Sequence, residues 1–178
     1  MIPVQRPGAG ELVNAVANCD IVRAKTLIER GADPDAIDVV SNERVLVTAI
    51  MSEYSGELTK LLIESGAEYE ARDNYGLTPL MYAASYNNPL ALAVLIGKGV
   101  ALDEKDPDGE TALEKANAYG FGEIAEMLKK ALRERQMQAE KRASDAAAAE
   151  QTRIATLRDT AARKQANLRK HMSGMKLQ

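Results

Sequence analysis

The side chains that could do chemistry are few in this sequence and far apart. His171 and Cys19 are the only residues of their types, and a nucleophile–base pair or a zinc site needs such side chains to be clustered. Asp106 and Asp108 are close together, but they fall in a DPDG stretch typical of a turn, where Asp is favoured because it bonds to the backbone. No phosphate-binding glycine motif occurs either. We therefore expect no catalytic residue, no metal and no cofactor.

The composition favours stacked helices. Of the 178 residues, 46 % are apolar and only 4 % are aromatic, so a core of useful size must be built from Leu, Ile, Val, Ala and Met. Cys19 cannot form an internal disulfide, and a lone Cys usually serves as a small buried hydrophobic side chain. We expect Cys19 to lie in the core.

The start of the chain bears on the compartment. The first ten residues, MIPVQRPGAG, lack the apolar stretch of a secretory leader, and no apolar run approaches the length of a membrane span. The sequence as it stands predicts a cytoplasmic protein, which would be periplasmic or secreted if a leader had been removed.

One apolar pattern recurs at a nearly constant spacing. The segments LIERGADPDAID, LIESGAEYEARD and LIGKGVALDEKD begin at Leu27, Leu62 and Leu95, 35 and then 33 residues apart. The segments DNYGLTPLMYAA from Asp73 and DPDGETALEKAN from Asp106 are also 33 residues apart. A fixed period in this range indicates repeats that cover one another's apolar faces.

These segments resemble the ankyrin repeat, in which a turn is followed by Thr-Pro-Leu, a short helix, a second helix and Gly-Ala-Asp. The resemblance implies an all-α ankyrin-repeat solenoid of helix-turn-helix pairs with short β-hairpin fingers. Four units fit, at residues 5–37, 38–72, 73–105 and 106–130. They predict an ankyrin-repeat domain over residues 1–130.

The third unit is the clearest copy. Gly76 suits a tight turn that needs a positive φ, and Thr78 can cap a helix that Pro79 opens. Asn87 stands where the family usually has Gly, and Asn is the next best residue for a left-handed helix stop. The second unit departs from the pattern, because Val-Leu-Val at 45–47 replaces Thr-Pro-Leu and the stretch before it is longer. Its finger is therefore atypical.

Residues 131–178 differ from the rest in charge and pattern. Residues 1–130 hold 12 Lys or Arg against 21 Asp or Glu, whereas residues 131–178 hold 11 against 5. Strong helix formers predominate there, and they predict a long basic amphipathic C-terminal helix. Apolar side chains share one narrow sector of this helix, an a/d-like seam: Ile154, Leu157, Ala161, Leu168, Met172 and Met175. Basic residues flank the seam: Arg153, Arg158, Arg163, Lys164, Arg169 and Lys170.

Four covers would suit this seam: the acidic repeats, a second copy of the chain, a separate protein, or an anionic membrane or nucleic acid. Nucleic acid is disfavoured, because the segment has no aromatic for base stacking and the acidic repeats would repel phosphate. A membrane is an option only for this helix. We expect a protein contact, with folding back onto the repeats as the next alternative, and the oligomeric state stays open.

The resemblance also implies where a partner binds. In ankyrin repeats the finger tips and the exposed side of the first helices line one concave face. Carried over by position, this predicts contacts from the second, third and fourth units: Val40, Asn42, Arg44, Glu53 and Tyr54; Asn74, Tyr75, Leu77, Ser85 and Tyr86; Asp108, Glu110 and Tyr119.

Tyrosines are prominent among these residues. By their positions in the repeats, we expect Tyr75, Tyr86 and Tyr119 in a row, with Tyr54 near the same rim. Tyr is a favoured contact residue because it offers a large rigid contact area with a polar tip. The alternative is that they fill gaps between helices, as we expect of Tyr69 and Tyr82. The surrounding acidic residues predict a partner with a basic surface.

The predicted function is recognition of a folded protein. By resemblance, the small divergent repeats suggest the stand-alone ankyrin proteins of bacteria that act as inhibitors or immunity proteins of a partner enzyme, by covering its active site. The alternative is a structural tether or adaptor, whose C-terminal helix oligomerises or binds a membrane or scaffold while the repeats hold cargo.

Overall fold

The structure, a computed structural model, describes residues 8–52 and 56–174, with side chains up to residue 169. The chain divides after Leu132 into two compact units, which we call the repeat unit (residues 8–132) and the tail (residues 133–174). The described residues form eight helices: α1 Ala9–Ala17, α2 Ile21–Glu29, α3 Val45–Met51, α4 Gly56–Glu64, α5 Pro79–Ser85, α6 Pro89–Lys98, α7 Ala112–Ala118 and α8 Gly122–Gly174.

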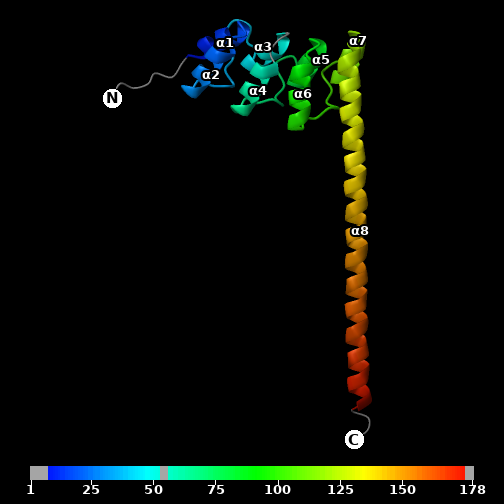
Figure 1. Cartoon of the computed structure of the whole chain (residues 1–178). Helices are drawn as coiled ribbons and strands as arrows, with labels where there is room; N and C mark the ends of the chain where they lie inside the picture. Colours follow the sequence, from blue (N-terminus) through cyan, green and yellow to red (C-terminus); the bar gives the residue numbers. More distant parts are fainter. Residues whose placement is uncertain (1–7, 53–55, 175–178) are drawn as a thin grey trace, which may run out of the picture. The chain divides into compact units, whose positions relative to one another are not determined.

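The helices of the repeat unit lie in two rows. The first helices of the pairs, α1, α3, α5 and α7, form one row, and α2, α4 and α6 form the other (Figure 1). Neighbours within each row contact each other. Leu27, Leu62 and Leu95 are at most 3 % exposed, so the three recurring leucines occupy equivalent buried layers. The expected ankyrin-type packing is confirmed.

The start of α8 closes the core of the repeat unit. Ile124, Ala125 and Leu128 are buried there. Beyond them α8 continues without a break past residue 130, where the sequence pattern set the end of the fourth repeat. In the tail, the side chains of residues 136–169 are all exposed. No described helix combines the length and the apolar character needed to cross a bilayer.

The helix ends follow the local chemistry of the third unit. The hydroxyl of Thr78 accepts a hydrogen bond from the N–H of Met81 (3.3 Å), and Pro79 opens α5. Asn87 adopts a φ of 51°, and Gly120, one period later, a φ of 73°. The expected left-handed helix stop is confirmed at both positions.

The expectation of a buried Cys19 is wrong. Cys19 is exposed and takes the left-handed position after α1, with a φ of 54°. This is the position that Asn87 and Gly120 occupy in later repeats. A helix stop of this kind turns the chain at the surface, so the side chain at this position points away from the core. The Cys19 sulfur lies 3.0 Å from the Ser52 hydroxyl.

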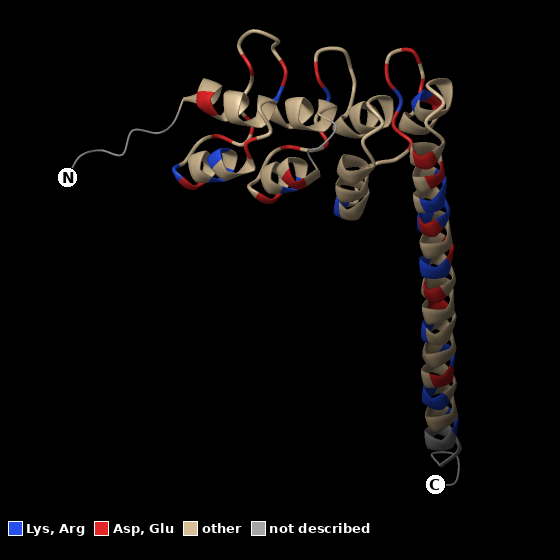
Figure 2. Ribbon diagram, turned by 45° about the horizontal axis from the view of Figure 1, so that its top comes forward, with Lys and Arg blue, Asp and Glu red and all other residues tan. Residues whose placement is uncertain are grey.

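Three loops project beyond the first helices on the same side of the repeat unit (Figure 2). We call them fingers 1, 2 and 3, at residues 33–44, 66–77 and 99–110. Only finger 1 contains an antiparallel bridge, between Ile37 and Arg44, among the described residues. Finger 2 is closed by backbone hydrogen bonds from the N–H of Asp73 to the carbonyl of Leu77 and from the N–H of Gly76 to the carbonyl of Asp73. Finger 3 has the equivalent pair, from Asp106 to Glu110 and from Gly109 to Asp106, and all four bonds are 3.0 Å long. The hairpins are thus shorter than expected.

Fingers 2 and 3 approach each other closely at Gly76. A Cβ atom at this position would lie 2.8 Å from Cγ of Pro107, and the residue has a φ of +77°. Both the contact and the backbone conformation require glycine. The close approach holds the two loops side by side.

Candidate protein-binding surface

Each finger is organised by one aspartate at the same point of the repeat. Asp38, Asp73 and Asp106 are 35 and then 33 residues apart. Asp38 accepts hydrogen bonds from the N–H of Val40 (3.0 Å) and the hydroxyl of Ser41 (2.9 Å). These two bonds, the backbone one first, hold the pKa of Asp38 below its ordinary value. The carboxylate therefore shapes the tip of finger 1 in the ionised state.

The carboxylates of Asp73 and Asp106 likewise accept hydrogen bonds from backbone N–H groups of fingers 2 and 3. Asp73 accepts from the N–H groups of Tyr75 (2.9 Å) and Leu77 (2.8 Å). Asp106 accepts from those of Asp108 (3.0 Å) and Glu110 (2.9 Å). Side-chain bonds of this kind stabilise a turn that the backbone alone would leave flexible.

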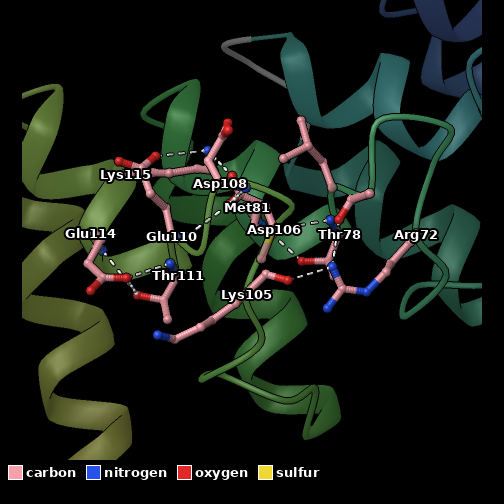
Figure 3. A network of polar contacts seen from close by, with 12 residues as sticks. Arg72, Thr78, Met81, Lys105, Asp106, Asp108, Glu110, Thr111, Glu114 and Lys115 are labelled. Atoms are coloured by element: carbon pink, nitrogen blue, oxygen red, sulfur yellow. Dashed lines mark hydrogen bonds and ion pairs between the residues drawn. The ribbon is translucent and has the colours of Figure 1, made fainter.

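Finger 3 is also fixed by an ion pair to α7 (Figure 3). The Lys115 ammonium lies 2.5 Å from Asp106, whose side chain is only 1 % exposed, and 3.2 Å from Glu110. The hydrogen bond from Lys115 and the one from the Glu110 N–H lower the pKa of Asp106. Burial lowers the pKa of Lys115, but its bonds to Asp106 and Glu110 outweigh burial and leave that pKa raised. Both groups stay charged at neutral pH.

Arginines tie neighbouring fingers together. Arg72 donates to the carbonyl groups of Gly76 (2.6 Å) and Lys105 (2.8 Å) and pairs with Glu104. It therefore joins finger 2 to finger 3 (Figure 3). Arg44 makes the corresponding link between fingers 1 and 2.

Arg44, and not Val45 as the sequence pattern indicated, takes the place of Thr78 in the second unit. Arg44 occupies the N-cap of α3 and makes no side-chain cap bond. Its guanidinium instead contacts Asp35 (3.2 Å) and Glu68 (3.3 Å), which lie in successive fingers. The Asp35 carboxylate also accepts from the N–H of Glu68 (2.8 Å). The lost cap is replaced by a link between fingers 1 and 2.

The predicted tyrosines differ in their placement. Tyr86 and Tyr119 are the C-cap residues of α5 and α7 and are 44 % and 61 % exposed. Tyr75 is 70 % exposed but lies in finger 2, before the other end of α5. Only Tyr86 and Tyr119 therefore occupy equivalent positions of neighbouring repeats. Tyr54 and Glu53 lie outside the described residues.

Each of these two exposed rings rests on another aromatic ring. Tyr86 stacks on Tyr82 with ring centroids 6.2 Å apart, and Tyr119 stacks on Phe121 at 5.8 Å. Tyr82 is buried, as expected, and its hydroxyl donates to Asp73. Burial, and then this bond, raise the pKa of Tyr82. Tyr69 packs against the core as expected.

The remaining predicted contact residues divide by exposure. Asn74, Val40, Asn42 and Asp108 are exposed. Arg44, Leu77, Ser85 and Glu110 are half-buried, and Leu77 packs against the core. The exposed group lies in the projecting loops. We define the finger face as fingers 1, 2 and 3 together with Tyr86 and Tyr119.

The finger face is acidic even after its internal pairing. Residues 33–44, 66–77 and 99–110 hold 12 Asp or Glu against 3 Lys or Arg. The ion pairs with Arg44, Arg72 and Lys115 engage part of this charge. Figure 2 shows acidic residues along all three projecting loops.

The hollows on the repeat unit include a small cavity and a wide-open one of about 440 Å³ lined by Asp35, Glu68 and Tyr69 among others. A cavity of about 10 Å³, lined in part by Tyr69, Thr78 and Val100, has room for one water molecule. Within the described part of the chain, no group of three or more His, Cys, Asp or Glu side chains could hold a metal ion.

The paired helices, projecting loops and left-handed stops define a helical-repeat protein of the solenoid class. The family model for ankyrin repeats in three copies matches residues 12–106 and 46–143. The chain belongs to the ankyrin-repeat family, whose repeats generally mediate contacts between proteins.

Several proteins match part of this chain. Glycerophosphocholine phosphodiesterase gde1 of Schizosaccharomyces pombe is 33 % identical over 119 residues, which are 66 % of this chain and 10 % of the relative. SH3 and multiple ankyrin repeat domains protein 2 of Homo sapiens is 36 % identical over 49 % of this chain and 5 % of the relative. A probable 26S proteasome regulatory subunit p28 of Saccharomyces cerevisiae is 30 % identical over 64 % of this chain and 50 % of its own length.

The chain thus spans from a twentieth to half of the length of these relatives.

Sequence reasoning missed several parts of this surface, among them the roles of Phe121 and Asp38. Phe121, which supports Tyr119, was not expected there, since its contact depends on how the chain turns between α7 and α8. The organising role of Asp38 was missed as well. Its 35-residue distance from Asp73 matches the repeat period and could have revealed it.

Proposed function

We propose that the repeat unit binds a folded protein through its finger face, with Tyr86 and Tyr119 as the central anchors. The observation that carries this proposal is the exposure of both rings at equivalent positions of neighbouring repeats. A tyrosine ring that already stacks on a neighbouring ring of its own chain loses little conformational entropy on binding. Aromatic anchors of this kind dominate many protein interfaces.

The charge of the finger face suggests the partner's chemistry. The acidic excess favours a surface that carries Lys or Arg. The internal pairing of several carboxylates keeps the fingers rigid, which lowers the entropy cost of binding. In this proposal the protein acts by covering a site on its partner, as an inhibitor or immunity protein does, and not by catalysis.

Two substitutions test the anchors. The partner is first isolated from native extract with the immobilised chain, and its dissociation constant is then measured with purified components. Tyr86→Ala and Tyr119→Ala should each cost about 2 kcal/mol, or roughly thirtyfold in affinity. Val22→Ala, on α2 and 78 % exposed, is the matched control and should change nothing. An unchanged affinity of the double tyrosine variant would rule out the finger face.

A second function, that of a tether, is favoured by one observation: the tail exposes Leu157 and Leu168. Removing the residues after Gln138 separates the two functions, because this cut keeps the buried Leu128 and Ala131. An inhibitor shortened in this way keeps its affinity for the partner. A tether loses its attachment through the tail.

A further inference from the structure

The tail carries an uncovered apolar seam with the spacing of a coiled coil. We define the tail seam as Ile154, Leu157, Ala161, Lys164 and Leu168, which follow one another at intervals of three and four residues. The side chains of Met172 and Met175, which the sequence pattern placed in this seam, lie outside the described residues. Three of its side chains, Ile154, Leu157 and Leu168, are 41 %, 61 % and 64 % exposed. At about 100° per residue the seam covers a sector of roughly 80°. This is the narrow seam of a coiled coil, whereas a helix lying on a membrane needs a wider apolar face.

Positive charge is concentrated in the same segment. Residues 153–169 hold five Lys or Arg and one Asp, whereas residues 133–152 hold four basic and four acidic residues. Arg153 lies at one edge of the seam and Arg158 at the other. Arg163, which we expected beside the seam, falls on the opposite face, where it pairs with Asp159 at 3.1 Å. The basic charge therefore borders the apolar side chains.

A second copy of the chain fits this seam poorly. In the heptad that places Ile154 at a and Leu157 at d, Arg153 is at g and Arg158 at e. A parallel dimer in register would set Arg153 of one copy against Arg158 of the other, and Lys164 against Lys164 at a core d position. Like charges at these positions disfavour pairing.

We propose that the tail seam is the docking site for an acidic amphipathic helix of another protein. Leu or Ile side chains of that helix would pack on Ile154, Leu157 and Leu168, and its Glu or Asp side chains would face Arg153, Arg158 and Lys164. This docking rests on the second of the two proposed functions and does not involve the finger face. The test of the tail seam can therefore fail while the test of Tyr86 and Tyr119 succeeds, and the tyrosine test can fail while the test of the tail seam succeeds.

The test uses the full chain and a labelled synthetic helix of about 21 residues, with Ile and Leu at a and d, Glu at e and g, and Glu opposite Lys164. Fluorescence anisotropy should show saturable one-to-one binding that weakens as salt is added. Leu157→Gln should weaken binding about tenfold or more, because Gln keeps the helix propensity but not the apolar contact. Ala166→Gln, on an exposed position away from the seam, is the matched control and should bind as the wild type does.

Several results would overturn the proposal. One is equal binding of a second peptide that carries Lys at e and g, and another is binding of the acidic peptide that Leu157→Gln leaves unchanged. Self-association in sedimentation that Leu157→Gln abolishes would make the occupant a second copy. Binding to phosphatidylserine vesicles without binding to the acidic peptide would make it a membrane. Failure to bind any of these probes would also refute the site.

Discussion

Leu62 in α4 and Leu157 in α8 both lie on the apolar side of a helix, but Leu62 is fully buried and Leu157 is 61 % exposed. In the repeat unit, each helix pair is covered by the next pair. In the tail, the helix is formed by good local helix formers from residue 133 onward. The comparison shows that helix formation and burial have separate causes: local propensity builds the tail, whereas only repetition builds a core.

The same contrast applies to the polar side chains. In the repeat unit, Arg72 donates to the carbonyl group of Lys105, 33 residues away, and Arg44 pairs with Glu68 of the next finger. The ion pairs of the tail, such as Arg163 with Asp159, join neighbours on one helix. Long-range pairs fix the shape of a surface, whereas local pairs add only a few tenths of a kcal/mol to the helix.

The largest expected difference between the two regions concerns their leucines. Leu62→Ala should destabilise the repeat unit by about 3 kcal/mol, because it leaves a cavity in a packed core. Leu157→Ala should leave that stability within about 0.5 kcal/mol of the wild type. Urea unfolding followed by circular dichroism measures both variants. Similar losses in the two variants would erase the distinction between the regions.

The next largest effect is expected at a buried cap. Asn88 is 2 % exposed, accepts from the N–H of Ala91, and donates to the carbonyl groups of Ile50 and Ser52 in the preceding repeat. Asn88→Ala should therefore cost about 2 kcal/mol, from the lost cap and the buried carbonyl groups. Asn167→Ala in the tail should be neutral or slightly stabilising, since Ala is the better helix former. Equal unfolding midpoints for the two variants would contradict this account.

A smaller effect of opposite sign is expected at Thr59. Its hydroxyl is buried in α4 and has no hydrogen-bond partner in the described part of the chain. Thr59→Val keeps the shape and removes the unpaired group, so it should stabilise the repeat unit by about 1 kcal/mol. The hydroxyl of Thr156 in the tail bonds to the Thr152 carbonyl (2.6 Å) and is exposed, so Thr156→Val should change little. Differential scanning calorimetry measures the melting temperature of each variant. A lower melting temperature for Thr59→Val than for the wild type would contradict the predicted stabilisation.

The smallest expected effect is a dependence on pH. The pKa of Asp106 is lowered from its ordinary value of 3.8, so its contribution to stability is present above that value and is lost as the pH falls through the folded-state pKa. The gap in urea midpoint between the wild type and Asp106→Asn should therefore be constant from about pH 7 to pH 5 and shrink below about pH 4. Asn167→Ala in the tail, which removes no ionisable group, should show no such trend. A gap for Asp106→Asn that persists down to about pH 2 would refute the role of the ion pair.

Much of this fold could be predicted from the sequence, because the signals were local and repeated. The spacing of Leu27, Leu62 and Leu95 gave the layers, and Thr78, Pro79 and Asn87 gave the ends of helices. Each of these residues acts through its own backbone or its nearest turn. Because these local features recur at each period, they place the helices throughout the repeat unit.

The parts that could not be predicted depend on contacts between repeats. Cys19 was expected in the core because of its residue type, but its backbone position in the turn decides its exposure. The pairing of Arg44 with Asp35 and Glu68 joins two fingers, and no local pattern marks it. The separation of Tyr75 from Tyr86 likewise follows from the direction of α5 and not from the spacing of tyrosines.

Amide hydrogen exchange on the full chain tests most directly whether the repeats cover one another while the tail seam stays uncovered. We predict that amides of α4 and α6 exchange only on global unfolding, whereas those of residues 153–169 exchange faster by several orders of magnitude. Addition of the acidic peptide should slow exchange in residues 153–169 alone. Protection of residues 153–169 equal to that of α4 in the isolated chain would contradict the account.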